Sequence, residues 1–210
     1  MANIIPAILE KDINEVQKKL NQLDGIVELA QIDVADGKFV DNKLFDPAGL
    51  IDLISPISLE AHLMVSSPEE WLPYLNPAIF RRVYFHIEAV PDPGDLILKL
   101  KEMDIEPGIA IKLDTPLDKL VEYAEWVDSV LFMSIVPGFQ GQEFHPEVLE
   151  RIDEFINQFP EHLIAIDGGI NENNILDAVK VGVDNISIGS KIFKGGKILE
   201  NYNKLNNIIS

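Results

Sequence analysis

Three residues that can move protons or bind a metal stand at the ends of apolar, strand-like stretches: Asp33, His62 and Asp167. Two carboxylates on either side of a small substrate can take a proton from one face of a carbon and return one to the other. That chemistry inverts a stereocentre next to a carbonyl, through an ene-diolate whose oxygens need positive charge nearby. We therefore assign Asp33 and Asp167 as candidate catalytic residues. The competing interpretation is that each aspartate caps a helix or ties down a loop.

The same three residues predict a metal site. An imidazole together with carboxylates suits Zn, Fe, Mn or Co, so Asp33, His62 and Asp167 are candidate ligands of one divalent ion. A lone histidine on an apolar strand is more often a hydrogen-bonded structural residue, and the two acids are what favour ligation here. His62 is also a candidate substrate contact, whereas His86 is expected to pack beside the site or to support it indirectly.

Three glycine-rich turns follow consecutive predicted strands. They read PGFQGQ at 137–142, IDGGI at 166–170 and IGS at 188–190. Backbone N–H groups in such turns can bind a phosphate, and glycines let the backbone approach it closely. The candidate substrate and phosphate contacts in these turns are Gly138, Phe139, Gln140, Gly141, Asp167, Gly168, Gly169, Gly189 and Ser190.

The elements that must position these residues alternate along the whole chain. The predicted strands are 3–9, 26–34, 57–65, 82–88, 107–113, 129–136, 163–166 and 185–188. The predicted helices are 12–23, 47–54, 67–75, 95–103, 117–124, 146–159, 172–181 and 197–208. Strict alternation indicates a parallel sheet, and this many units predict a single α/β domain over residues 1–210, a (β/α)₈ TIM barrel. An open doubly wound sheet usually begins with a glycine-rich dinucleotide turn, and residues 8–12 contain no glycine.

Composition excludes several classes of protein. The net charge of −18 disfavours a nucleic-acid partner, because phosphate backbones need a basic surface. No apolar run reaches the roughly 18 residues that span a bilayer, so no membrane segment is expected. The chain has no cysteine, which excludes disulfides and thiolate ligands and fits a cytoplasmic protein.

Several motifs, in this order, resemble the ribulose-phosphate 3-epimerase family. They are QIDVADGKFVDN at 31–42, EAHLMV at 60–65, FHIEA at 85–89, PGFQGQEF at 137–144, IDGGI at 166–170 and IGSKIF at 188–193. The resemblance implies a TIM barrel that interconverts D-ribulose 5-phosphate and D-xylulose 5-phosphate with one divalent metal, held by two histidines and two aspartates. It also implies that Asp33 and Asp167 are the acid/base pair, that a small phosphorylated sugar is the partner and that the protein is a homo-oligomer.

Three departures from the family pattern stand out. Gln31 replaces a metal-binding histidine, Ala7 replaces a substrate-contacting serine, and Lys112 stands where an asparagine is usual. An amide oxygen is a weaker ligand than imidazole for such metals, so metal binding is in question. Lys112 is therefore a candidate compensating cation for the ene-diolate, against the alternative that it pairs with a nearby acid.

Three functions follow from these observations. The leading one is epimerisation at C3 of a ketopentose phosphate. A second is a metal-independent sugar-phosphate isomerase or decarboxylase of the same superfamily that uses Lys112. The third is a non-catalytic phosphosugar-binding protein, which the two buried acids disfavour because burying them costs stability.

Overall fold

The strands close into a parallel barrel. The structure is a computed structural model that describes residues 2–210. Its strands pair in chain order and β8 pairs with β1, which closes the barrel and confirms the predicted TIM barrel. The strands are β1 (Asn3–Ile8), β2 (Leu29–Ala35), β3 (Ser58–Met64), β4 (Phe80–His86), β5 (Glu106–Ile111), β6 (Ser129–Met133), β7 (Leu163–Asp167) and β8 (Asn185–Ile188).

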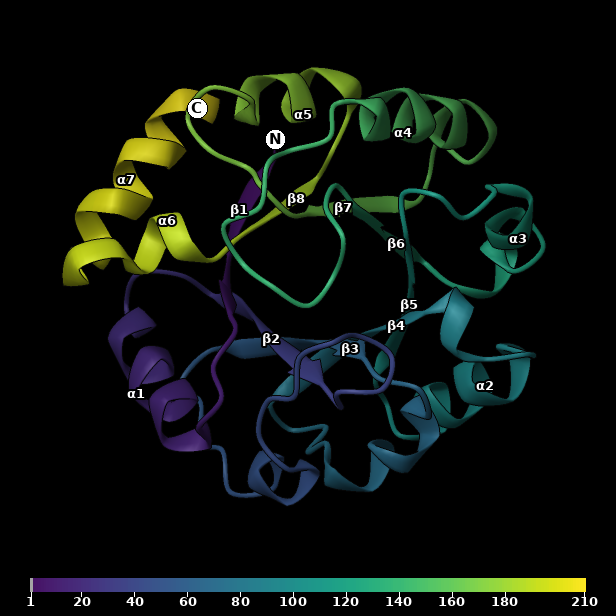
Figure 1. Cartoon of the computed structure of the whole chain (residues 1–210), viewed down its shortest axis with the longest axis horizontal. Helices are drawn as coiled ribbons and strands as arrows, with labels where there is room; N and C mark the ends of the chain where they lie inside the picture. The colour runs from purple at the N-terminus through teal and green to yellow at the C-terminus, as the bar shows by residue number, and fades with distance from the viewer. Residues whose placement is uncertain (1) are drawn as a thin grey trace.

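Helices form a ring outside the strands (Figure 1). The α-helices are α1 (Ile13–Leu23), α2 (Gly94–Glu102), α3 (Asp118–Val121), α4 (Glu147–Gln158), α5 (Ile175–Val181), α6 (Ser190–Phe193) and α7 (Ile198–Ile209). The 3₁₀ turns are η1 (Pro47–Leu50), η2 (Pro68–Glu70), η3 (Leu72–Tyr74), η4 (Ile87–Ala89), η5 (Ala124–Trp126) and η6 (Lys194–Gly196). None of the helices within residues 2–210 is long and apolar enough to cross a bilayer.

The first helix shows how the sequence specifies this ring. Asp12 precedes α1, and its carboxylate accepts a hydrogen bond from the backbone N–H of Asn14 at 2.9 Å, which caps the helix. Val16, Leu20 and Leu23 then recur at helical spacing and are buried. α1 therefore packs its apolar face inward against the barrel, as the sequence pattern predicted.

Two predicted helices are wrong. The expected helix 67–75 is two short 3₁₀ turns, because Pro73 has no N–H to donate and its ring clashes with the preceding turn of an α-helix. The side chain of Ser67 makes no capping hydrogen bond there. The expected helix 47–54 is the single 3₁₀ turn η1, where Gly49 weakens helix formation and packs closely against Ile13.

The boundaries of several other elements also differ from the predicted ones. The predicted helix 117–124 is reduced to α3 followed by η5, and the helix expected at 172–181 begins only at Ile175. The strand expected at 129–136 ends at Met133, and α6 appears where no helix was predicted. None of these shifts changes the strand order, so the carboxyl ends of the strands still gather at one end of the barrel.

Alternation along the strands separates the core from the site. On β2, Ile32 and Val34 are buried in the large cluster that lies between strands and helices, whereas Gln31 and Asp33 lie on the opposite, inward face. A separate apolar cluster lies inside the barrel, and it consists of Tyr84, Ala110, Leu131, Met133, Ile135 and Ala165. The polar residues of β2 therefore face a mixed interior, because Gln31 is in register with Glu60, which forms a buried ion pair with Arg82.

Candidate active site

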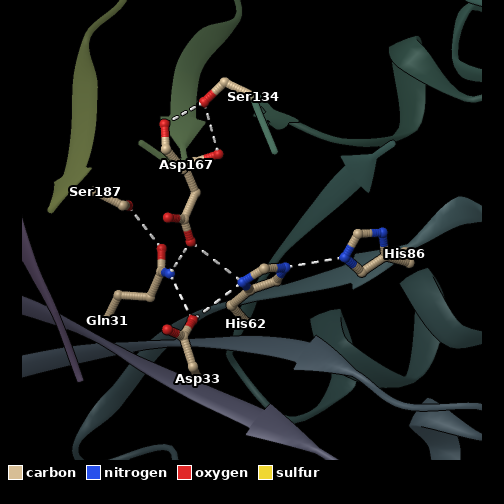
Figure 2. Close-up of polar contacts among 8 residues, drawn as sticks. Gln31, Asp33, His62, His86, Ser134, Asp167 and Ser187 are labelled. Atoms are coloured by element: carbon tan, nitrogen blue, oxygen red, sulfur yellow. Dashed lines mark hydrogen bonds and ion pairs between the residues drawn. The ribbon is translucent and has the colours of Figure 1, made fainter. Parts of the chain in front are cut away.

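Strand register brings the two acids and His62 together. Asp33 on β2 is the register partner of His62 on β3, and Asp167 ends β7 opposite Ser187 of β8. Nδ1 of His62 lies 3.1 Å from Oδ1 of Asp33 and 3.4 Å from Oδ2 of Asp167. Figure 2 shows both carboxylates directed at this ring nitrogen. The structure thus assembles the acid pair and the histidine that the sequence singled out.

Gln31 lies between the two acids and is fully buried. Its Nε2 donates to Oδ1 of Asp33 at 2.8 Å and to Oδ2 of Asp167 at 2.6 Å (Figure 2). Its Oε1 accepts a hydrogen bond of 2.7 Å from the hydroxyl of Ser187. The amide therefore bridges the same two oxygens that face His62.

A chain of hydrogen bonds runs from His62 to the outer side of the barrel mouth. Nε2 of His62 is 3.0 Å from Nε2 of His86, and Nδ1 of His86 is 3.1 Å from Oε2 of Glu88. Because the carboxylate of Glu88 can only accept, Nδ1 of His86 carries the proton and its Nε2 accepts from His62. In a neutral His62 this leaves the lone pair of Nδ1 facing Asp33 and Asp167. A proton or a cation fits that position.

Burial and these contacts shift the pKa values of the chain in opposite directions. Burial disfavours a charged His62, yet hydrogen bonds to Asp167 and Asp33 raise its pKa to about 9. Burial lowers the pKa of His86 to about 4. Burial also raises the pKa of Asp33, and the nearby charge of Asp167 adds to that rise. The two acids thus favour the charged form of His62, whereas burial favours the neutral form of His86.

A cavity of about 260 Å³ opens above the acids. Asp33, His62 and Asp167 line it together with the three glycine-rich turns. The segment between β6 and α4, which carries the first of these turns, extends over the centre of the barrel (Figure 1). The predicted site residues that line this cavity are Asp33, His62, Gly138, Phe139, Gln140, Gly141, Asp167, Gly168, Gly169, Gly189 and Ser190.

The turn at 137–142 is held in place by side chains around it. Gln142 donates to the carbonyl oxygens of Val136 and Phe139 at 2.6 and 2.8 Å. Asn42 donates to the carbonyl oxygen of Gly138 at 2.7 Å, which ties this turn to the segment after β2. A Cβ on Gly189 would clash with Nε2 of Gln140 and lie 2.9 Å from the carbonyl oxygen of Ala7, so glycine permits the close approach to the backbone of β1.

Comparison with known proteins identifies the family. Residues 3–193 match the model of the Ribulose-phosphate 3 epimerase family. The chain belongs to this family. It is similar to ribulose-phosphate 3-epimerases from Eremothecium gossypii (31% identity over 204 residues, 90% of this chain and 85% of the relative) and Mycobacterium tuberculosis (32% over 196 residues, 90% and 85%). The family is therefore one of enzymes that act on carbohydrate phosphates, as the motifs predicted.

Solved structures with low sequence identity share the same fold. The chain is similar to KGPDC from Streptococcus mutans, with a TM-score of 0.70 at 9% identity over 99% of this chain and 97% of that one. It is also similar to 3-hexulose-6-phosphate synthase from Salmonella typhimurium, with a TM-score of 0.68 at 16% identity over 98% and 97%. At such identities the likeness extends to the barrel alone.

The epimerase family uses a divalent metal, and three residues of this chain fit one. Ligand atoms of Asp33, His62 and Asp167 all lie within 4.8 Å of one another and are buried or partly buried. The lone pair on Nδ1 of His62 and the two carboxylate oxygens form a donor set that suits a divalent ion. These three residues could therefore hold a metal. Gln31 occupies the corner where the family pattern places a histidine, and there it presents an N–H group.

Lys112 lies outside this cavity. Its Nζ is 3.9 Å from the centre of the Phe39 ring, and its side chain lines a neighbouring groove with Phe39 and Phe139. Its backbone N–H donates to Oε1 of Glu88 at 2.9 Å. A role for Lys112 as the compensating cation stays a prediction, and the position of its ammonium group on the Phe39 ring does not favour it.

Three polar residues of the site were missed from the sequence. Ser187 holds Gln31, and Ser134 donates to the carbonyl oxygens of Asp167 and Gly168 at 3.0 and 2.6 Å. Lys191 adds a basic residue to the lining of the cavity. Ser187 had a usable signal, since it is an inward position of β8 directly before the IGS turn. The others depend on loop geometry after the strands end.

Proposed function

We propose that this chain inverts the configuration at C3 of D-ribulose 5-phosphate to give D-xylulose 5-phosphate. The observation that carries the proposal is the pairing of Asp33 and Asp167 in a cavity that is also lined by glycine-rich turns. Membership of the ribulose-phosphate 3-epimerase family supports the choice of substrate. The small cavity volume suits a pentose phosphate rather than a nucleotide or a polymer.

The acid pair supplies the two proton transfers. One carboxylate removes the proton from C3, which leaves an ene-diolate, and the other carboxylic acid delivers a proton to the opposite face. Two neighbouring carboxyl groups do not both ionise readily, because each charge disfavours the other. Burial and the charge of Asp167 raise the pKa of Asp33, which makes it easier for Asp33 to take up a proton during the reaction.

The developing charge on the ene-diolate oxygens is met by groups around the acids. A divalent ion (Zn, Fe, Mn or Co) bound by Asp33, His62 and Asp167 would supply positive charge to those oxygens. His62, held by His86, presents its Nδ1 to the same region, and Gln31 keeps both carboxylates in place through its N–H groups. These residues orient the acids, because one oxygen of each carboxylate is held between Gln31 and His62.

The glycine-rich turns bind the phosphate in this proposal. Gly168, Gly169 and Gly189 bring backbone close to the cavity, and Ser190 adds a hydroxyl beside them. Lys191 supplies local positive charge in a chain of net charge −18. The phosphate therefore anchors the sugar so that C3 lies between the carboxylates.

The test is epimerisation in D₂O with two matched variants, Asp33→Asn and Asp167→Asn. We expect the wild type to convert D-ribulose 5-phosphate and to incorporate deuterium at C3. Each variant keeps one working carboxylate, so each should exchange the C3 hydrogen of only one epimer, and the two variants should choose opposite epimers. Either turnover by both variants or exchange of the same epimer by both would refute the two-acid mechanism.

A wild type that binds the sugar phosphate without exchanging its C3 hydrogen would favour the non-catalytic function instead. Binding is measured by calorimetry with D-ribulose 5-phosphate, so a loss of chemistry is separated from a loss of binding. A cytoplasmic location and a homo-oligomeric state stay predictions, which fractionation and light scattering of the purified chain would check.

A further inference from the structure

The amide of Gln31 occupies one corner of a ring of four polar atoms. Nε2 of Gln31 lies 2.8 Å from Oδ1 of Asp33 and 2.6 Å from Oδ2 of Asp167. The same two oxygens lie 3.1 and 3.4 Å from Nδ1 of His62. Three corners are atoms that can ligate a metal, and the fourth is an N–H donor, which cannot (Figure 2).

The hydrogen bonds around the amide define which end faces the acids. An ionised carboxylate only accepts, so the two oxygens require the N–H₂ end of Gln31. On the other side, the hydroxyl of Ser187 donates to Oε1 at 2.7 Å. A hydroxyl can also accept, so Ser187 can serve the amide in either orientation. The two carboxylates therefore determine the orientation of the Gln31 carboxamide. The hydroxyl of Ser187 can form a hydrogen bond with the amide in either orientation.

The strand between these two residues leaves room for the contact. β1 lies between β8 and β2 in the barrel, and its residue in register with Gln31 is Ala7. Ala7 lines the cavity with only a methyl group, so it places no polar side chain between Gln31 and Ser187. Gln31, Asp33, His62 and Ser187 are each less than 5% exposed, so water does not compete freely for these hydrogen bonds.

We propose that Gln31 is an amide switch that makes metal binding by this site weak and reversible. Without an ion, its N–H₂ group bridges Asp33 and Asp167 and takes the place of a cation between them. With an ion, the carboxamide turns over, so that Oε1 faces the metal and Nε2 donates to Ser187. The ion must then replace two N–H···carboxylate hydrogen bonds, which are stronger than neutral ones. The effect of this switch on catalysis rests on the proposed function. Its effect on metal affinity does not depend on that function.

The test is titration of the metal-free chain with Co²⁺, followed by calorimetry and by the visible absorption of the bound ion. The variants are Gln31→His, which offers an imidazole without any rearrangement, and Gln31→Glu, which offers a carboxylate of nearly the same shape. Changing a partner of a ligand typically alters metal affinity about 10- to 100-fold, and a direct ligand counts at least as much. We therefore expect both variants to bind one Co²⁺ at least about tenfold more tightly than the wild type.

The matched control is Gln22→His, which adds a histidine on the exposed face of α1 away from the acids. It should bind Co²⁺ as the wild type does. Equal affinity of the wild type and Gln31→His would overturn the proposal, because Gln31 would then impose no penalty. Failure of the wild type and both Gln31 variants to bind the ion would overturn it as well.

A second measurement needs no variant that might fold poorly. In nuclear magnetic resonance spectra, the two amide protons of Gln31 should be protected from solvent in the metal-free wild type and should shift when Zn²⁺ binds. Zn²⁺ binding that leaves these protons unchanged contradicts the switch. Because no substrate is present, a chain that fails to epimerise D-ribulose 5-phosphate can still pass this test, and the two proposals fail separately.

Discussion

Nε2 of His62 and Nε2 of His86 lie 3.0 Å apart, and the carboxylate of Glu88 fixes which of them carries the proton. His86 therefore accepts from His62 and holds the ring of His62 with Nδ1 turned toward Asp33 and Asp167. His86 makes no contact with the cavity and acts on the chemistry through His62 alone. This relationship makes His86 a positioning residue.

The first prediction concerns that contact. His86→Phe removes the acceptor, so His62 loses its fixed orientation and kcat should fall about 10- to 100-fold, with a smaller change in KM. His86→Gln should recover part of kcat, because its amide oxygen can accept from His62 while its N–H₂ donates to Glu88. Steady-state kinetics on both variants measure how the effect divides between kcat and KM. Full kcat in His86→Phe would show that His62 needs no such support.

The second prediction concerns stability in acid. Burial opposes the charge on Glu88, but hydrogen bonds from His86, Thr115 and the backbone of Lys112 outweigh it and lower its pKa to about 2. A carboxyl group with a lowered pKa contributes stability above its ordinary value of 4.5, and that contribution is lost as the pH falls toward 2. His86 adds to the loss, since its pKa falls from 6.5 to about 4 in the folded chain.

We therefore expect Glu88→Gln to be less stable than the wild type at neutral pH. The difference in the free energy of unfolding between the two chains should shrink as the pH falls below 4.5. Urea unfolding at a series of pH values measures the free energy of each chain. Glu102→Gln, a change on the exposed side of α2, serves as control and should follow the wild type throughout. If the difference in the free energy of unfolding between Glu88→Gln and the wild type does not change with pH, the carboxylate of Glu88 is not the source of the loss of stability in acid.

The third prediction concerns the proposed phosphate site. A Cβ at position 189 would clash with Nε2 of Gln140 and lie 2.9 Å from the carbonyl oxygen of Ala7. Gly189 has φ −95°, so Gly189→Ala changes packing without forcing a left-handed backbone. Misplacing the bound phosphate should lower kcat/KM by about a hundredfold. Adding Gln140→Ala removes the nearer contact and should restore part of the loss, whereas no loss in the single variant would place the phosphate elsewhere.

The fourth prediction separates Lys112 from the chemistry. Its ammonium group packs on Phe39 and the residue does not line the central cavity, so Lys112→Met should keep the kcat of the wild type. The loss of the contact with the ring should cost less than about 1 kcal/mol of stability, as is typical of exposed cation–π pairs. Thermal unfolding and turnover measured on the same sample test both. A large fall in kcat would revive the metal-independent interpretation.

The sequence predicted the barrel because its signal is local and repeated. Period-two alternation in the strands predicted that Asp33 and His62 lie on the inward face. Asp167 was predicted as a site residue because it stands at the carboxyl end of a strand. Two helices failed because proline and glycine act against the surrounding helical pattern, as Pro73 does between η2 and the end of η3. Strand order alone then brought the three site residues to one end.

The orientation of Gln31 could not be predicted in the same way. Its partners Asp33, Asp167 and Ser187 come from three strands, and only their positions in space show that the amide donates to both acids. The sequence showed that a ligand had been replaced. It could not show that Gln31 donates hydrogen bonds to the oxygens of Asp33 and Asp167, which are themselves candidate metal ligands.

β1 lies between β2 and β8, and its residue Ala7 is in register with Gln31, which donates no side-chain hydrogen bond to β1 but accepts one from Ser187 on β8; this arrangement has an evolutionary consequence. A larger polar side chain at position 7 would offer Gln31 and Ser187 a competing partner, so substitutions at these positions are not independent. Among relatives that carry glutamine at the position of Gln31, we expect a small residue beside it on the first strand and a hydroxyl on the last. The three positions would then be inherited as one unit, and a change at any one of them would favour change at the other two.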